Sequence, residues 1–309
     1  MSENHYLVLT GGIGGARLVD GLVLEAGGEN VTAIVNTGDD FNHLGLRISP
    51  DIDTLAYTLA GLADPVKGWG RRDETWSGME TVAKLGGPDW FSLGDRDLAL
   101  HLVRTERLSS GETLERITAD LASCMGVTAR LVPMSNEDCG VMIVTERGQL
   151  TFQDYFVRQR CEPMVRSIDL DCARQARPAP GVAQAFARKD LRAIIIAPSN
   201  PWLSIDPILA VPTITDHLKA ATVPVIAVTP LPGGKAVKGP TAKIMNELGL
   251  QLDVQTIADH YHGLLDGIMI DEADRDPVGV AFRRTDTIMR DAAGRRRLAR
   301  AVVDWIARF

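Results

Sequence analysis

Four glycines interrupt an apolar run near the start of the chain, with a spacing that could bind a phosphate. They are Gly11, Gly12, Gly14 and Gly15. They follow the strand-like run Tyr6–Thr10 and open a stretch with helical spacing. Glycine tolerates positive φ and lets the backbone approach a ligand, while a helix N-terminus favours an anion. Arg17 stands where GxGxxG would place its third glycine, and the P-loop spacing is also absent, so a packing turn is the alternative.

Four carboxylates follow the second strand-like run, Val31–Asn36. They are Asp39, Asp40, Asp51 and Asp53. Mg²⁺ commonly bridges one or two carboxylates to the phosphates of a substrate. We therefore expect Asp40 and Asp51 to contact a metal ion or the substrate. The alternative is a solvated turn followed by a helix N-cap at Asp51 or Asp53.

Two further loops carry polar side chains that could position a substrate. In the segment 94–97, Asp97 can cap a helix. Asp95 is then left to accept hydrogen bonds from a polar ring or to act as general base toward an alcohol. Ser199 and Asn200 lie between two prolines after a strand-like run. There they could recognise a base or a ribose, or simply form a turn.

Lysines and tryptophans provide two weaker indications of a substrate-binding site. The glycine loop 233–240 carries two lysines, one of them Lys238, which could close over phosphates. Exposed lysines on a solvated loop are the alternative. Trp69, Trp76 and Trp90 could form a stacking wall for a flat ring, although core packing is the commoner use of tryptophan.

Composition indicates a folded globular protein, for which the cytoplasm is the default location. The 309 residues are 45% hydrophobic and 24% charged, close to globular averages. A net charge of -7 argues against a general nucleic-acid binder, which would need a basic face. No apolar stretch reaches the roughly 18 residues that cross a bilayer. The four cysteines lack CxxC pairing, so neither a zinc site nor a disulfide framework is indicated.

Alternating strand-like and helical runs predict an α/β fold. Tyr6–Thr10 and Val31–Asn36 flank a helical pattern, and such a βαβ unit implies parallel strands. Ala193–Ala197, Pro224–Thr229 and Gly267–Asp271 are further candidates for buried strands of the same sheet. Ligands then belong at the carboxyl ends of these strands.

The middle of the chain differs from this pattern. Residues 141–157 alternate between apolar and polar, which predicts a hairpin with its turn at Glu146–Gln149. We therefore expect a doubly wound, mostly parallel, Rossmann-like sheet built from residues 1–129 and 186–309. Residues 130–185 would form a smaller inserted α+β segment that contributes to the acceptor site.

Seven short motifs occur in order along nearly the whole chain. They are TGGIGGAR at 10–17, NTGDD at 36–40, SPDIDT at 49–54, GDRD at 94–97, PMS at 133–135, PSNP at 198–201 and KGP at 238–240. This ordered set resembles the 2-phospho-L-lactate transferase family, CofD or FbiA. The resemblance implies transfer of a phospholactyl or phosphoenolpyruvyl group from a guanosine diphosphate adduct to the ribityl hydroxyl of the deazaflavin FO. GMP would be released, in the biosynthesis of coenzyme F-420, and Mg²⁺ would be required.

The resemblance also assigns roles on the donor side. The four glycines would hold the guanosine diphosphate moiety, with Ser199 and Asn200 near its guanine and ribose. Asp40, Asp51 and Asp53 would serve the metal ion and the phosphates, and Asp40 would also be catalytic. An in-line displacement at the distal phosphorus is the expected step.

On the acceptor side, the resemblance implies that Asp95, Met134 and Ser135 face the deazaflavin, with Asp95 as a second catalytic carboxylate. The chain departs from the family pattern at two positions. Arg17 stands where lysine is frequent, which keeps the charge but changes the geometry. Asn136 stands where the archaeal pattern often has aspartate, which puts the acceptor contact there in doubt.

A non-catalytic nucleotide-sugar-binding regulator, which the CofD-like superfamily also contains, is the alternative function. It would keep the glycine loop without a deazaflavin pocket. For the enzyme, the residues leave open whether the donor carries lactate, enolpyruvate or glycerate. Small-molecule substrates are the expected partners, with no nucleic acid and no membrane, and a homodimer is the usual prior for such an enzyme.

Overall fold

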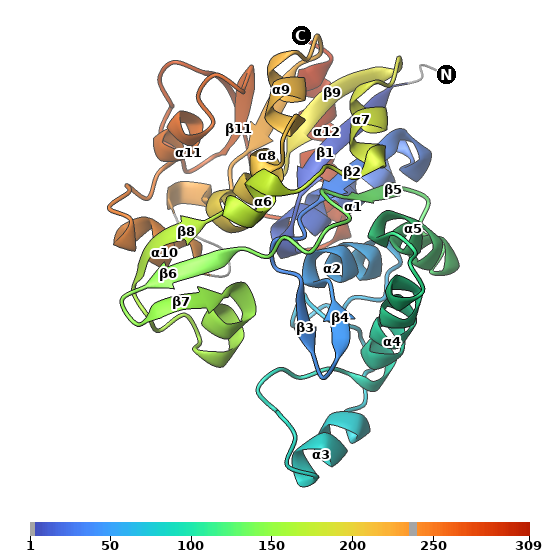
Figure 1. Ribbon diagram of the computed structural model, residues 1–309. Coiled ribbons are helices and arrows are strands. Elements are labelled where there is room, and N and C mark those ends of the chain that lie inside the picture. Colours follow the sequence, from blue (N-terminus) through green and yellow to red (C-terminus); the bar gives the residue numbers. More distant parts are fainter. Residues whose placement is uncertain (1–3, 235–239) are drawn as a thin grey trace.

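Within the described residues, seven strands form one parallel sheet at the centre of the molecule (Figure 1). The computed structural model describes residues 4–234 and 240–309. The strands are β1 His5–Thr10, β2 Val31–Val35, β5 Arg130–Pro133, β9 Leu191–Ile196, β10 Val225–Val228, β11 Gly267–Asp271 and β12 Ala281–Thr285. Their order across the sheet is β12-β11-β10-β9-β1-β2-β5, and every neighbouring pair is parallel.

Both faces of this sheet are buried, because successive side chains of a strand point to opposite sides. In β1, Tyr6 and Val8 join one hydrophobic core, while Leu7 and Leu9 join the other. The first core is closed by α1 Gly12–Ala26, α2 Pro50–Leu59, α5 Leu114–Cys124 and α12 Ala292–Ile306. The second is closed by α6 Asp171–Gln175, α7 Pro180–Phe186, α8 Asp206–Ala210, α9 Ile214–Lys219, α10 Thr241–Glu247 and α11 Val254–His260.

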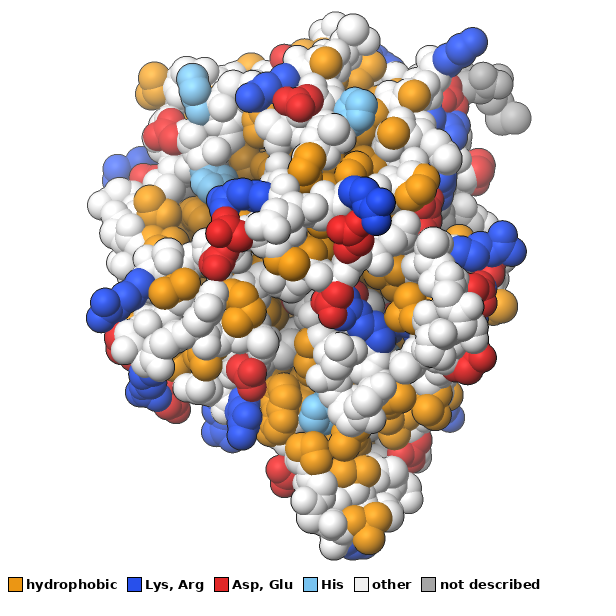
Figure 2. Space-filling view, viewed as in Figure 1, with side chains coloured by type: hydrophobic (Ala, Val, Ile, Leu, Met, Phe, Trp, Pro, Cys, Tyr) orange, Lys and Arg blue, Asp and Glu red, His pale blue; other side chains and the backbone are white. Residues whose placement is uncertain are grey.

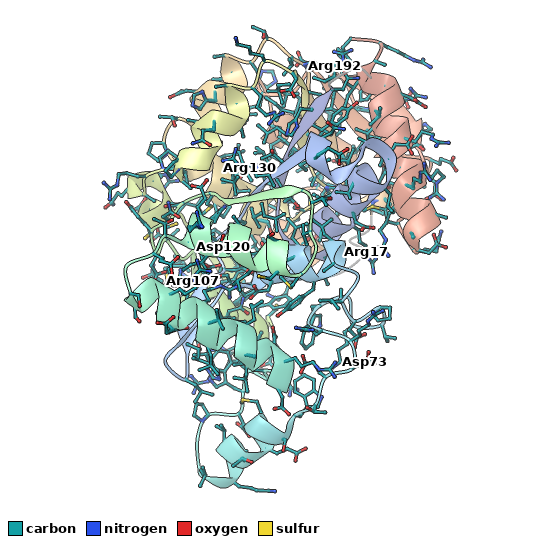
Figure 3. The ribbon with its side chains drawn as sticks, turned by 90° about the vertical axis from the view of Figure 1, so that its right-hand side faces the viewer. Arg17, Asp73, Arg107, Asp120, Arg130 and Arg192 are labelled. Carbon is teal, nitrogen blue, oxygen red and sulfur yellow. The ribbon has the colours of Figure 1, made fainter. Side chains whose placement is uncertain are left out.

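Smaller elements extend from the carboxyl end of the sheet. They are the antiparallel hairpin of β3 Phe41–His43 and β4 Leu46–Ile48, helices α3 Ser77–Lys84 and α4 Asp95–Ser109, and the antiparallel sheet of β7 Gly148–Thr151, β6 Met142–Thr145 and β8 Val165–Asp169. Hydrophobic side chains gather on the surface over α3 and the β3–β4 hairpin (Figure 2). Arg107 of α4 donates to Asp120 of α5 at 2.6 Å, which ties these two helices together (Figure 3).

The structure confirms the expected fold class, a doubly wound parallel sheet with smaller additional elements. Two details of the sequence interpretation were wrong. Strand β5, placed in the inserted segment by the sequence, is an edge strand of the central sheet. The second strand of the expected hairpin ends at Thr151, and residues 154–158 form a short π-helical segment instead of continuing it.

The short strands β3, β4 and β8 and one strand of the central sheet were not predicted. The composition of the central-sheet strand explains why it was missed. Strand β12 reads AFRRT, and its side chains are exposed or half-buried. An edge strand with this pattern lacks the apolar run that marks the interior strands. Among the described residues no helix is both long and apolar enough to cross a bilayer.

A close approach of α1 and α12 provides a test of this packing. A Cβ at Gly21 would overlap the backbone carbonyl of Arg295 on α12. Alanine in a helix interior normally stabilises by about 1 kcal/mol relative to glycine. We expect Gly21→Ala to lower the free energy of unfolding instead, measured by urea denaturation.

The control for this test is Gly294→Ala on α12, where a Cβ would meet only ordinary contacts of 3.4 Å or more. It should leave the free energy of unfolding unchanged or raise it. Equal behaviour of the two variants would contradict the close packing of α1 against α12.

Candidate active site

The order of the strands reverses between β1 and β9, where β2 and β5 lie to one side and β10 to β12 to the other. Open parallel sheets bind ligands beyond the carboxyl ends of the strands at such a point. A cavity of about 970 Å³ lies there. Residues that follow β1, β2, β9, β10 and β12 all line it. The topology of the sheet therefore determines where the site can be.

The glycine turn, residues 11–15, forms the start of α1 and one wall of this cavity. Gly12 has φ of 65°, a conformation that strains other residues, and its missing side chain leaves open space. Side chains at the other three glycines would overlap Asp51, Pro198 and Thr10. The turn is therefore both tightly packed and open to a ligand at Gly12. The first N–H groups of a helix have no intrahelical partner, which suits an anion.

Asp51, in the first turn of α2, fixes the glycine turn in place. Its Oδ1 accepts the N–H of Gly12 at 2.7 Å, and its Oδ2 accepts the amide of Asn36 at 2.9 Å. Burial raises the pKa of Asp51 to about 6, and these two donors oppose the rise. The carboxylate thus joins three segments of the chain and also lines the cavity.

Asp39 is the carboxylate that the sequence interpretation did not select, although its neighbour was chosen. It is buried, and its Oδ1 has no hydrogen-bond partner among the described residues. Burial, reinforced by the charges of Asp51 and Asp40, raises its pKa well above the usual range. Asp39 lines the main cavity and also an adjoining cavity of about 340 Å³. The feature of the sequence that could have identified Asp39 is its position next to Asp40.

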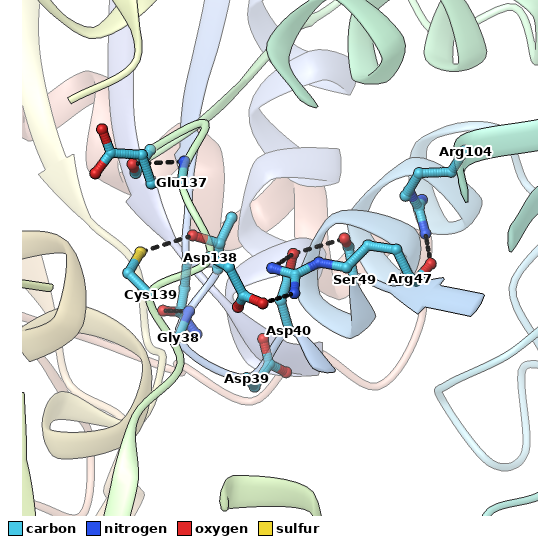
Figure 4. A network of polar contacts seen from close by, with 12 residues as sticks. Gly38, Asp39, Asp40, Arg47, Ser49, Arg104, Glu137, Asp138 and Cys139 are labelled. Carbon is cyan, nitrogen blue, oxygen red and sulfur yellow. Dashed lines mark hydrogen bonds and ion pairs between the residues drawn. The ribbon is translucent and has the colours of Figure 1, made fainter. Parts of the chain in front are cut away.

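Asp40 lines the adjoining cavity and not the main one, and its carboxylate lies beside Ser49 and Arg47 (Figure 4). Ser49 donates to its Oδ2 at 2.7 Å, and a guanidinium nitrogen of Arg47 lies 3.4 Å from the same oxygen. The Oδ1 of Asp40 has no partner among the described residues. Burial raises the pKa of Asp40 to about 7, against the opposing attraction of Arg47. Asp40 is therefore an ionisable group with a free oxygen beside the main cavity.

Asp53, expected to serve the metal ion, is bound elsewhere. Arg104 of α4 is fully buried and holds both carboxylate oxygens of Asp53. Neither cavity is lined by Asp53. The structure therefore places this carboxylate in an internal ion pair that fastens α2 to α4.

Neither Asp95 nor Asp97 takes the position that was expected for it. Asp95 is the first residue of α4, and its carboxylate accepts from Thr75 and from the backbone N–H groups of Ser77 and Gly78. It thereby binds the N-terminus of α3 and lines neither cavity. Asp97 was wrongly taken as the helix cap, because Gly94 occupies that position. Its carboxylate instead accepts the hydroxyl of Tyr57 at 2.5 Å.

Ser199 and Asn200 line the main cavity, as expected, but their polar groups have protein partners. The hydroxyl of Ser199 donates to the carbonyl of Gly11 at 2.7 Å and accepts its N–H at 3.1 Å. Asn200 accepts two N–H groups at the start of the helical segment 201–205 and donates to Thr241 at 2.9 Å. Both residues shape the site, and these contacts occupy the groups that were expected to read a base.

Two other expected residues, Met134 and Ser135, do not reach the described site. Met134 is buried in the second hydrophobic core, and Ser135 is buried and donates to the carbonyl of Arg177 at 2.7 Å. Neither of them lines a cavity. Lys238 falls within 235–239, outside the described residues.

Aromatic side chains form the far wall of the main cavity. The residues are Trp69, Trp90, Phe91, Phe152 and Phe156. Two of the three expected tryptophans are among them. Trp76 is not, and it lies instead under the ammonium group of Lys67, 4.7 Å from the ring centroid. The sequence interpretation missed the two phenylalanines from the inserted segment, whose rings stack at 5.5 Å. The feature of the sequence that could have identified these two phenylalanines is their i, i+4 spacing, which makes two side chains neighbours on a helix.

The acidic end of the cavity suits a divalent cation that is shared with a substrate. Within 4–234 and 240–309 no cluster of three or more His, Cys, Asp or Glu side chains could hold a metal by itself. Mg²⁺, however, often takes only one or two carboxylates and completes its shell with phosphates and water. Asp39 and Asp51 fit that pattern, because both line the cavity with raised pKa values that a cation would lower.

Comparison with known proteins shows the family of this chain. A family model described as "2-phospho-L-lactate transferase CofD" matches residues 7–304. The chain belongs to the CofD family. It is 40% identical over 306 residues to a "Phosphoenolpyruvate transferase" of Streptomyces coelicolor, covering 95% of each chain. A protein of the same name from Mycobacterium avium is 38% identical, covering 93% of this chain and 94% of that one.

CofD membership makes the chain a member of a transferase family. The fold is shared with a crystal structure of a UPF0052 family protein from Bacillus halodurans. The TM-score is 0.66 with 18% identity, covering 98% of this chain and 99% of the other. That likeness concerns the fold alone.

The ion pair of Asp53 provides a test of its structural role in this CofD protein. Arg104→Met leaves the carboxylate of Asp53 buried without its cation, so we expect the free energy of unfolding to fall by about 3–5 kcal/mol. Adding Asp53→Asn removes the unpaired charge and should recover part of the loss. Urea denaturation measures both effects.

The exposed Arg116→Met is the control, and it should change stability little. If the Arg104→Met protein were as stable as the parent, the ion pair would not be the tie between α2 and α4 that the structure indicates.

Proposed function

We propose that this chain transfers an enolpyruvyl phosphate group from a guanosine diphosphate adduct to the ribityl hydroxyl of the deazaflavin FO. The reaction would release GMP and belong to the biosynthesis of coenzyme F-420. One observation carries the proposal: a single cavity joins the glycine turn, the carboxylates Asp39 and Asp51, and an aromatic wall. A nucleoside diphosphate, a cation and a flat ring each have a matching surface there. The names of the relatives favour enolpyruvate over lactate or glycerate.

On the donor side, the chain would bind and orient the diphosphate. The N-terminus of α1 offers the positive end of the helix dipole and the backbone N–H groups that follow Gly12, whose own N–H is donated to Asp51. Asp39 and Asp51 would hold Mg²⁺ against the phosphate oxygens. When bound, Mg²⁺ supplies positive charge where negative charge develops during phosphoryl transfer.

On the acceptor side, the aromatic wall would hold the deazaflavin ring by stacking. The two cavities meet at Asp39, Trp90, Phe152 and Gln153, which line both. Asp40 lies beside this junction with its Oδ1 free of any partner among the described residues. We assign this oxygen to accept the proton of the ribityl hydroxyl as that hydroxyl attacks the distal phosphorus. A pKa near 7 suits a general base at neutral pH.

Product analysis tests the reaction. The protein is incubated with FO, Mg²⁺ and each of the enolpyruvyl, lactyl and glyceryl adducts of guanosine diphosphate, and products are identified by mass spectrometry. We expect the enolpyruvyl adduct to react fastest, with one GMP released for each product. Gly12→Val should give no product, since a β-branched residue resists positive φ and fills the space at the phosphate.

The variant Arg116→Met, at an exposed side chain of α5 that lines neither cavity, serves as the control in this assay. Stabilisation by UDP-sugars and not by GDP in a thermal-shift experiment, together with no transfer from any donor, would support a nucleotide-sugar-binding regulator instead.

The proposed base predicts a pH dependence of kcat. Asp40 must be ionised to accept a proton, so the rate should rise with pH and level off above about 7. Asp40→Asn should remove this rise and lower kcat by about 10²-fold or more. Asp138→Asn is the matched control, because Asp138 contacts the same Arg47 at 2.7 Å but is exposed. The Asp138→Asn protein should retain the rise of kcat with pH. If this variant lost the rise, the result would argue against Asp40 as the proton acceptor.

A further inference from the structure

The main cavity carries opposite charges at two places. The acids Asp39 and Asp51 lie beyond β2 and at the start of α2, while Arg17 and Arg290 line the cavity from α1 and from the loop before α12. Figure 3 shows Arg17 close to the place where α1 approaches α12. Arg17 belongs to the same helix whose first turn is the glycine turn, so its position is fixed relative to Gly12. The cavity thus has a cationic surface in addition to its cation-binding carboxylates.

The contacts of Arg17 leave most of its donors available. One guanidinium nitrogen, Nη1, donates to the carbonyl of Met289 at 3.2 Å. Across residues 4–234 and 240–309, no carboxylate lies within ion-pair distance of Arg17. The neighbouring Arg295 differs, because Asp20 binds it at 2.8 Å. A guanidinium group has five N–H donors, so a single carbonyl leaves room for an oxyanion.

The electrostatic surroundings of Arg17 also favour an anion. The side chain is half-buried, and burial together with the charge of Arg295 lowers its pKa. Guanidinium nevertheless remains protonated at neutral pH, since its ordinary pKa exceeds 12. A cation that has lost part of its water and has no carboxylate partner attracts any oxyanion that can reach it. The cavity gives a ligand that access.

We propose that Arg17 binds an oxyanion of the donor substrate, an inference that rests on the proposed function. Two groups of the donor offer this chemistry: its diphosphate and the carboxylate of its three-carbon acid. The planar fork of guanidinium matches the paired oxygens of either group. If the carboxylate is the ligand, Arg17 distinguishes the complete donor from GDP. If the diphosphate is the ligand, Arg17 extends the phosphate site of the glycine turn.

Calorimetric titration of Arg17→Gln and Arg17→Lys distinguishes these two sources. GDP and the complete enolpyruvyl donor are each titrated with Mg²⁺ into the parent and the variants. A charge-assisted hydrogen bond contributes about 1.5–3 kcal/mol, so Arg17→Gln should weaken binding by roughly ten- to a hundredfold. Arg17→Lys keeps the charge and should lose less. The affinity of the Arg17→Gln protein should also depend less on salt, because one ionic contact is missing.

Each outcome has one meaning for Arg17. Weaker binding of GDP assigns Arg17 to the diphosphate, and weaker binding of the complete donor alone assigns it to the carboxylate. Unchanged affinity for both ligands overturns the inference, as does an equal loss in Arg17→Lys with unchanged salt dependence, which would indicate only the contact with Met289. The exposed Arg116→Gln is the control and should match the parent.

The same titration keeps the two proposals distinguishable. If the parent binds GDP and transfers the group while Arg17→Gln behaves like the parent, only the role of Arg17 fails. If the parent binds neither GDP nor the donor, the proposed function fails, and the inference fails with it.

Discussion

A single buried carboxylate organises this site. Asp51 accepts the N–H of Gly12 and the amide of Asn36, so it connects the start of α1, the end of β2 and the start of α2. Each of these segments follows the sheet at its carboxyl edge, where the topology directs a ligand. A buried charge is stable only where donors surround it, and here the donors are the groups that shape the phosphate turn. The geometry of the turn and the ionisation of Asp51 are therefore linked.

The clustered aspartates differ in how their burial is compensated, and this difference separates structure from chemistry. Arg104 binds both oxygens of Asp53, and this carboxylate lines neither cavity, so it is not placed to contact a ligand. Ser49 and Arg47 both contact one oxygen of Asp40, and one oxygen of Asp39 has no hydrogen-bond partner in the part of the chain that the structure describes. Desolvation raises the pKa of Asp39 and Asp40 because compensation is incomplete. A carboxylate whose burial is incompletely compensated by hydrogen bonds and ion pairs can bind a metal ion or accept a proton.

The sequence predicted the interior of the sheet and the glycine turn, because buried parallel strands are continuous apolar runs and glycine marks a strained turn. It could not predict β12, which is exposed, or distinguish Asp39 from Asp40. Two adjacent residues in a loop point in different directions, and only the folded loop determines which one enters the cavity. Asp95 was misjudged for a related reason, since its partners are seventeen to twenty residues earlier in the chain.

Part of the aromatic wall of the cavity belongs to an element outside the central sheet, and this separates two parts of the site. Phe152 and Phe156 come from the inserted segment, which Gln153 joins to the donor side through the carbonyl of Asp39 at 3.3 Å. Lys243 of α10 fastens the same segment by donating to the carbonyl of Pro163 at 2.9 Å. The glycine turn, built into the edge of the sheet, can change little without disturbing the core. The aromatic wall comes from segments outside the sheet, so separate parts of the chain determine the geometry of the turn and the composition of the wall.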